Sequence, residues 1–295
     1  MNSNQRAYLE LHLAVLLFGL TAILGALISL SAIVLVWWRV LLTCISLLFL
    51  IRMGTDLKKI PTKFIVQYMG IGILVALHWI CFFGSVKLAN ASISLICMST
   101  TSFFTAFLEP LFFRQKIKWY ESLLGFLIIP GMVLVVNHTE LDMMAGIVVG
   151  LLSALLASLF SILNKKLVNE ADPMSITFLE LGSGWLFISC LLPFYFYQNP
   201  TDAFLPLSMD WLYLFILALL CTTLAYVLAL RALKFLSAFA SNLTINLEPV
   251  YGIILAWLLL NEDKDLSTGF YWGCVIILLA VFAYPLIKKW YEPKD

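Results

Sequence analysis

Four ionisable side chains lie inside long apolar runs of this 295-residue sequence, at Arg39, Glu109, Glu180 and Glu248. A charge in a hydrocarbon environment costs roughly 2.5–3.5 kcal/mol on insertion scales, so such residues usually face a cavity or a charged partner. A guanidinium attracts an anionic group, whereas a carboxylate binds a cationic group or a proton. These side chains are therefore candidates for binding a charged small molecule.

Arg39 and Glu180 occupy equivalent depths, six residues into the second and the seventh apolar run. In the functional interpretation each lines one end of a route through the protein, Arg39 nearer the outside and Glu180 nearer the cytoplasm. The alternative is a structural ion pair or a hydrogen bond at a helix end. The sequence leaves both interpretations open.

Two Glu-Pro pairs lie within apolar runs, Glu248-Pro249 and Glu109-Pro110. A proline inside a helix removes a backbone donor and clashes with the preceding turn, so Pro249 predicts a kink that frees a carbonyl. Glu248 beside it could bind a proton or an amine, or be a neutral part of a hinge. Glu109 is within reach of Arg114 and is either an interfacial charge or a gating residue.

Aromatic and amide side chains are further candidates. Trp79, next to His78, lies 147 residues before Tyr226, so the two rings could flank a substrate by stacking or cation–π contact. His78 could also titrate near neutral pH. Asn242 and Asn246 offer neutral hydrogen bonds, either to a substrate or between helices. Simple aromatic packing and a hydrogen-bonded histidine are the alternatives.

The composition determines the environment of these residues. Hydrophobic residues make up 62% of the chain and charged residues 12%, against roughly 45–50% and about 25% in a soluble domain. We therefore take the bilayer as the solvent. With a net charge of +1 the sequence has no concentrated basic face, so nucleic acid is excluded as a partner.

Several other classes of site have no support in the sequence. Six dispersed cysteines and three dispersed histidines show no metal-ligand spacing, so we expect no metal, no cofactor and no catalytic residues. A nucleotide-binding loop is also absent, so direct use of ATP is not expected. The chain is therefore not expected to be an enzyme. The alternatives kept open are a membrane-embedded enzyme and a non-transporting sensor or scaffold.

Crossing the hydrocarbon core takes roughly 20 apolar residues as a helix. The sequence contains ten such runs and predicts an all-α membrane protein of ten transmembrane helices. The predicted spans are residues 8–28, 33–53, 65–86, 91–113, 119–136, 143–165, 174–197, 210–230, 237–260 and 267–288.

The orientation follows from lysine and arginine, which concentrate in cytoplasmic loops. Fifteen of the 18 basic residues lie at the N-terminus or after an even-numbered span. Only Lys87 and Lys264 lie on the other side, and Arg39 lies within a span. We expect a multi-pass protein of the plasma (inner) membrane with both termini cytoplasmic.

The second half of the chain resembles the first at an offset of about 147 residues, with residues 86–91 over 233–238 and 111–115 over 258–262. The matches fall at equivalent ends of spans. Because five spans are an odd number, the second repeat must be inverted relative to the first. The sequence thus predicts two inverted five-helix repeats, residues 1–138 and 139–295, with a substrate site near the midplane between them.

Three segments resemble the second-repeat signature of the drug/metabolite transporter superfamily, in particular its EamA-type ten-helix proteins. They are Ala-Leu-Lys-Phe-Leu-Ser-Ala at 232–238, Asn-Leu-Glu-Pro-Val-Tyr at 246–251, and Leu-Leu-Leu-Asn-Glu at 258–262. The first repeat departs from the family pattern. Span four has Ser102 where the family commonly has proline, and Glu109-Pro110 follows seven residues later.

The resemblance implies alternating-access transport of a small organic metabolite, of the amino acid, amine or nucleoside class, with export as the expected direction. Arg39, His78, Trp79, Glu180, Tyr226, Asn242, Asn246 and Glu248 are the expected lining of a central cavity. Glu109, Pro110 and Pro249 are expected to act in gating or as hinges. The expected partners are the substrate, the lipid bilayer and protons or a counter-substrate, for a monomer or a homodimer.

Overall fold

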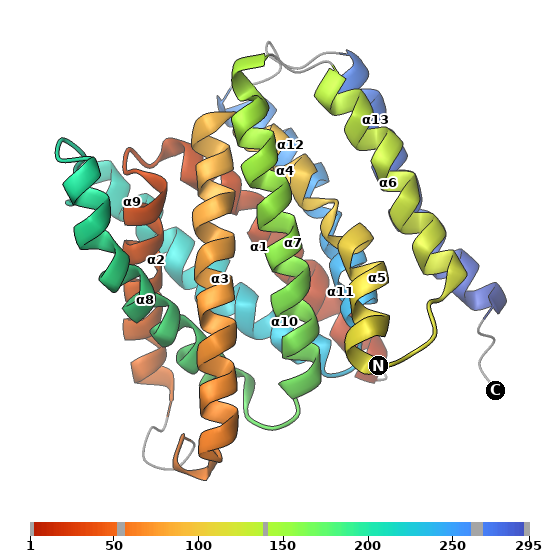
Figure 1. Ribbon diagram of the computed structural model, residues 1–295, viewed down its shortest axis with the longest axis horizontal. Coiled ribbons are helices and arrows are strands. Elements are labelled where there is room, and N and C mark those ends of the chain that lie inside the picture. Colours follow the sequence, from red (N-terminus) through yellow and green to blue (C-terminus); the bar gives the residue numbers. More distant parts are fainter. Residues whose placement is uncertain (1–2, 52–56, 138–140, 261–267, 292–295) are drawn as a thin grey trace.

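The computed structural model describes residues 3–51, 57–137, 141–260 and 268–291. Every regular element within these ranges is helical, and no strand occurs among them (Figure 1). The boundary expected between residues 138 and 139 lies outside the described residues, as do Arg52, Lys264 and Lys294 of the basic-residue pattern and Asn261-Glu262 of the third signature segment.

The ten predicted spans are confirmed, with ends that differ from the prediction by at most five residues where they are described. Eight helical segments are long and apolar enough to cross a membrane by length and composition. The first half comprises α1 (Ser3–Leu27), α2 (Ala32–Leu50), the short η1 (Leu57–Lys59), α3 (Thr62–Leu88), α4 (Ala91–Met98), α5 (Thr101–Phe113) and α6 (Trp119–Asn137). The second comprises η2 (Leu141–Met143), α7 (Met144–Leu167), α8 (Pro173–Gln198), α9 (Ser208–Ala218), the π-helical η3 (Leu219–Leu224), α10 (Ala225–Leu233), α11 (Ala238–Ile245), α12 (Glu248–Leu260) and α13 (Thr268–Tyr291).

The halves pack as two inverted five-helix repeats. α3 of the first half lies against α7 of the second, and α10 of the second half lies correspondingly against α1 of the first. The parts of spans four and nine pack in the same reciprocal way. α5, the second part of span four, contacts α11, the first part of span nine, and α4 contacts α12. The last helices of the two halves, α6 and α13, lie side by side at one edge of the bundle (Figure 1).

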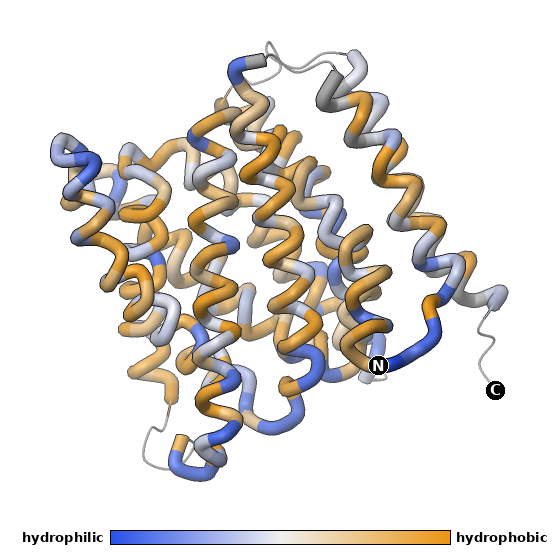
Figure 2. Tube along the Cα trace, in the orientation of Figure 1, coloured by the Kyte–Doolittle hydropathy of each residue, from blue (hydrophilic) through white to orange (hydrophobic). Residues whose placement is uncertain are grey.

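Apolar residues cover the length of the helices, as a bilayer requires (Figure 2). Hydrophilic segments are concentrated at the lower ends of the helices in this view, in the turns between α5 and α6, between α7 and α8, and before α3. The start of α1 and the end of α13 lie at this same end of the bundle (Figure 1).

The fourth and ninth spans are both broken near their middle. α4 ends at Met98 and α5 begins at Thr101, while α11 ends at Ile245 and α12 begins at Glu248, an offset of 147 residues at each end. Pro249 is the second residue of α12, where its missing N–H costs little. The break predicted in span nine thus lies immediately before Glu248.

The break in span four contains no proline. Thr100 donates its hydroxyl to the carbonyl of Cys97 at 2.7 Å, and Ser102 donates to that of Ser99 at 3.2 Å. The carbonyl of Cys97 also accepts the backbone N–H of Thr100 at 3.1 Å, so short-range bonds span the interruption. Pro110 lies farther along, in the last turn of α5, whose helix continues through it to Phe113. The Glu109-Pro110 pair is therefore not the position at which this span breaks.

Candidate functional site

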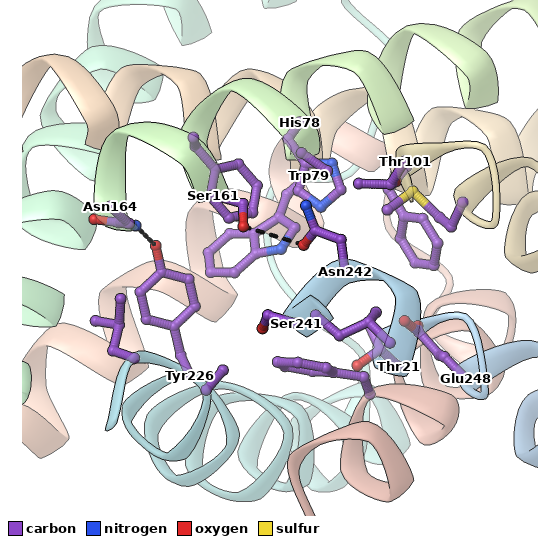
Figure 3. Close-up of a pocket in the computed structure, with 18 of the residues that line it drawn as sticks. Thr21, His78, Trp79, Thr101, Ser161, Asn164, Tyr226, Ser241, Asn242 and Glu248 are labelled. Atoms are coloured by element: carbon purple, nitrogen blue, oxygen red, sulfur yellow. Dashed lines mark hydrogen bonds between the residues drawn. The ribbon is translucent and has the colours of Figure 1, made fainter. Parts of the chain in front are cut away.

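A cavity of about 110 Å³ lies between the two halves (Figure 3). That volume accommodates several water molecules or a small organic group. Helices α1, α2, α3, α4 and α5 of the first half and α7, α10, α11 and α12 of the second contribute to its wall. The wall is mainly apolar and aromatic, with a small number of polar groups, which is the usual character of a small-molecule site.

Arg39 on α2 brings the only arginine side chain to this wall within the described part of the chain. Its guanidinium carbon lies 4.0 Å from the centroid of the Trp79 ring, and its Nε donates to the hydroxyl of Thr222 in η3 at 2.7 Å. Nη1 is buried and has no hydrogen-bond partner among the described residues. Arg39 forms no ion pair there, so the structural ion pair considered from the sequence is not found in these residue ranges.

Glu248 contributes a carboxylate to the same wall, as the first residue of α12. It is 6% exposed, and its side chain forms neither an ion pair nor a hydrogen bond with the described residues. The cavity thus holds one acidic and one basic group that are not in contact with each other.

His78 lies on α3 with its Nδ1 3.0 Å from the backbone carbonyl oxygen of Ser153 on α7. The hydroxyl of Ser153 in turn donates to the carbonyl of His78 at 3.1 Å. Nδ1 also lies 2.8 Å from the Ser153 hydroxyl. The ring therefore joins the two halves in the wall of the cavity.

Trp79 and Tyr226 both line the cavity, as the repeat offset predicted they would face a common site. Tyr226 lies on α10, and its ring plane meets that of Trp79 at 69°. Aromatic faces at this depth can contact either an apolar side chain or a cationic group of a ligand.

Asn242 on α11 is held by a chain of hydrogen bonds across the halves. Its Nδ2 donates to Thr105 on α5 at 2.9 Å, and its Oδ1 accepts from Ser161 on α7 at 3.1 Å (Figure 3). Thr105 and Ser158 are also joined at 2.9 Å. Asn242 therefore lines the cavity and at the same time fixes the first part of the broken span against two helices.

Two expected lining residues lie elsewhere. Glu180 on α8 is fully buried and sits behind the wall, where Tyr226 donates its hydroxyl to Oε2 at 2.6 Å. Asn246 lies in the break between α11 and α12, and its Nδ2 donates to Ser102 at 2.8 Å. It borders a separate apolar crevice between α4, α12 and α13. Glu180 is separated from the cavity by Tyr226 and Asn164, its two hydrogen-bond partners, and Asn246 is turned toward Ser102 of α5.

Glu109 contacts the second half directly. Its carboxylate accepts the backbone N–H groups of Ala238 at 3.0 Å and Phe239 at 2.6 Å, which open α11. A carboxylate there compensates unpaired N–H groups and the positive end of the helix dipole. Pro110 and Pro249 do not line the cavity.

Several lining residues were not predicted from the sequence. On α7 they are Ala157, Phe160, Ser161 and Asn164, and elsewhere Thr21 and Ser241. The signal on α7 was present, since Ser153, Ala157, Ser161 and Asn164 recur at three- and four-residue spacing and so share one helix face. In an apolar span, such a stripe of small and polar residues indicates a face turned toward protein.

Among the described residues, no group of three or more His, Cys, Asp or Glu side chains gathers as metal ligands. Two ion pairs form within these same ranges, Arg6 with Glu10 and Lys118 with Glu121, and both lie outside the cavity.

Residues 5–137 and 144–284 each match the model of the EamA-like transporter family. Among curated proteins, an uncharacterized transporter of Bacillus subtilis, YxxF, is 23% identical over 79% of this chain and 73% of its own length. A second from the same organism, YdfC, also an uncharacterized transporter, is 24% identical over 79% of this chain and 74% of its own.

A solved crystal structure of a protein superimposes with a TM-score of 0.72, covering 95% of this chain and 98% of that one. The sequence identity is 14%, so this likeness shows the fold alone.

Proposed function

Because this chain belongs to the EamA-like transporter family, we propose that it exports a small organic metabolite across the membrane by alternating access. The proposed substrate belongs to the amino acid, amine or nucleoside class and binds in the cavity between the halves. We further propose that the protein resides in the plasma membrane with both termini cytoplasmic, and that residues 1–138 and 139–295 form its two repeats. The proposed transporter acts as a monomer or as a homodimer.

The two ionisable side chains of the cavity support the proposal and favour one substrate class. Arg39 and Glu248 line one cavity with opposite charges and without an ion pair in the described residues. An unpaired buried charge is costly, so a ligand that pairs both gains from both. An α-amino acid carries a carboxylate for Arg39 and an ammonium group for Glu248. Among the three substrate classes, this arrangement favours the amino acid.

Alternating access is supported by the inverted packing and by the two broken spans. Inverted-repeat carriers commonly bind substrate near the midplane, beside discontinuous helices, and change access by moving one repeat against the other. The breaks at residues 99–100 and 246–247 lie at matching positions of the two repeats. Thr101 and Glu248, each the first residue after a break, both line the cavity.

Contacts at both ends of the bundle could open in such a cycle. At the end of α1, Ser29 donates its backbone N–H and its hydroxyl to Asp210 on α9, at 2.9 Å and 2.6 Å. At the opposite end, Glu109 binds the start of α11. Each contact joins the two halves, so opening one end requires breaking one set while the other persists.

The test is exchange in proteoliposomes. Purified protein is reconstituted, preloaded with an unlabelled compound and supplied with the same compound in labelled form, beginning with amino acids, then amines and nucleosides. Saturable counterflow by wild type, weakened in Arg39→Gln and Glu248→Gln, is expected. Failure of every compound to exchange would reject the carrier and leave a sensor, scaffold or membrane-embedded enzyme.

A further inference from the structure

The side chain of Glu180 is a carboxyl group with no cation to neutralise it among the described residues. It is fully buried on α8, and neither ion pair of those residues includes it. Oε2 accepts from the hydroxyl of Tyr226 at 2.6 Å and from Nδ2 of Asn164 at 3.3 Å, while Oε1 is buried without a hydrogen-bond partner. A carboxylate in the membrane interior with two neutral donors is poorly compensated, and binding a proton removes its charge.

Within the described ranges, no charged group faces Glu180 from the helices that pack around it. Tyr226 on α10 and Tyr68 on α3 are the titratable side chains that interact with it. Arg39 on the adjacent α2 directs its guanidinium to Thr222 and Trp79. On α7, Lys165 donates to the backbone carbonyl of Leu233 at 2.8 Å. Because no described cation neutralises Glu180, a proton is the cation that the carboxylate would bind.

The shell of the carboxyl group can accept both protonation states. When Glu180 is charged, Oε2 receives two hydrogen bonds, as observed. When it is neutral it carries a donor and needs an acceptor. Asn164 has Oδ1 buried without a partner, and exchanging the two ends of its amide places this oxygen where Nδ2 now lies. One side chain can thus satisfy both states.

The same two side chains connect the carboxyl group to the cavity. Asn164 and Tyr226 line the cavity and are themselves hydrogen-bonded at 3.3 Å (Figure 3), whereas Glu180 lies behind them. Glu180 therefore does not contact a substrate in the cavity, but Tyr226 and Asn164, its two hydrogen-bond partners, are exposed to that substrate. Any movement of the Tyr226 ring on substrate binding alters the bond that stabilises the charged form.

We propose that Glu180 is a proton-binding site behind the cavity wall, coupled to substrate through Tyr226 and Asn164, so that proton movement accompanies transport. The coupling rests on the proposed function, whereas the proton site itself does not. Glu180 acts here as a positioning and coupling residue and does not contact the substrate.

Infrared difference titration of the purified protein tests the site without any substrate. Between acidic and alkaline buffer, wild type should show the bands of buried protonated carboxyl groups, Glu248 among them, and Glu180→Gln should lose the component that Glu180 contributes. Glu170→Gln, which changes an exposed carboxyl group near the start of α8, is the matched control and should retain it. A band of unchanged size in Glu180→Gln would overturn the proposal.

Proteoliposomes containing the pH dye pyranine test the coupling, with each neutral L-amino acid added outside. Wild type should change the internal pH as the amino acid moves, and Glu180→Gln should lose this change while labelled counterflow continues. Counterflow by wild type with no pH change, or a pH change retained in Glu180→Gln, would overturn the coupling. Absence of counterflow by wild type would instead reject the proposed function, and the infrared result would still decide the proton site.

A second variant covers the case in which Glu180→Gln does not fold. Tyr226→Phe keeps the ring in the cavity and removes only the hydroxyl that donates to Glu180. The pH change should be lost or slowed more than counterflow. An equal loss of both would contradict a coupling role.

Discussion

Trp79 and Tyr226 pack edge to face in the wall of the cavity, with ring centroids 6.2 Å apart. They come from α3 and α10, which belong to the third spans of the two halves. Arg39 lies over the Trp79 ring, and Glu180 binds the hydroxyl of Tyr226. This pair therefore stands between a buried cation and a buried carboxyl group, and changes in either ring should affect ligand binding.

Replacing Trp79 with leucine should weaken substrate binding. The change removes the aromatic face on which Arg39 lies and the edge contact with Tyr226. Both contacts are present in the free protein, so their loss, about 0.5–2 kcal/mol for the cation–π contact and about 0.5–1.5 kcal/mol for the aromatic pair, lowers the stability of the wall. A cationic substrate group that contacts the indole face loses a cation–π contact of the same size, which predicts an increase in Kd of roughly twofold to 30-fold. Binding is measured by thermal shift against amino acid concentration. Trp290→Leu, at an exposed position, is the control, and equal effects in both would contradict the prediction.

Arg39→Gln and Glu248→Gln should change selectivity in different ways. Without Arg39 the cavity loses its partner for a carboxylate, so amino acids should compete less well and amines should retain their binding. Without Glu248 the ammonium partner is lost, so amines and amino acids should both bind more weakly. Hydrogen bonds to charged groups contribute about 1.5–3 kcal/mol, equivalent to roughly a tenfold to 150-fold loss in affinity.

These two variants are compared by competition against labelled counterflow. Lys63→Gln, an exposed change at the start of α3, is expected to behave as wild type. A uniform decrease for all compounds in both variants would argue that the charges serve only the fold.

Gly72→Ala should destabilise the protein. A Cβ at Gly72 on α3 would lie 1.9 Å from the carbonyl oxygen of Glu180, so α3 and α8 would have to separate. Overpacking of this kind typically costs about 1–3 kcal/mol, and a contact with backbone leaves little room for adjustment. Thermal unfolding in detergent should show a lower Tm. Gly70→Ala is the control on the same helix, because a Cβ added there would meet no atom within 4 Å. Equal Tm values for the two variants would disprove the close contact.

Glu109→Ala should loosen the start of α11. The variant leaves the N–H groups of Ala238 and Phe239 without their carboxylate acceptor, at a cost of about 0.5–2 kcal/mol by analogy with helix caps. Hydrogen exchange of the peptide that covers α11 should become faster. Glu170→Ala provides the control, because Glu170 is exposed and lies away from α11. Unchanged exchange in Glu109→Ala would show that the contact contributes nothing to the stability of this end.

The sequence predicted the spans well, because the bilayer requires a fixed length of apolar helix and charges mark its ends. The repeat offset of 147 residues placed Trp79 and Tyr226 at equivalent depths and made them candidates for one cavity, with simple aromatic packing as the alternative, and both line the cavity. Depth along a helix does not determine which face is turned inward. For this reason two expectations failed. Glu180 was expected in the cavity but lies behind its wall, and Asn246 was expected there but is turned toward Ser102.

The break in span four was not predicted from the sequence. Pro249 identified its counterpart in span nine, whereas Ser99 and Thr100 have no comparable local signature. The interruption is spanned by bonds from the hydroxyls of Thr100 and Ser102 to the carbonyls of Cys97 and Ser99. Serine and threonine also make such bonds in uninterrupted helices, so their presence does not identify a break. Pro110, the local signal that is present, lies in the last turn of α5.

The side-by-side placement of α6 and α13 has an evolutionary consequence. Each is the last helix of its half, so the contact joins equivalent surfaces in the manner of an isologous dimer. A five-helix ancestor inserted in both orientations would have met its own copy through this same surface. Joining two such copies in one chain would make that encounter intramolecular and would let the two halves differ, as they do in the cavity with Arg39 on α2 and Glu248 on α12.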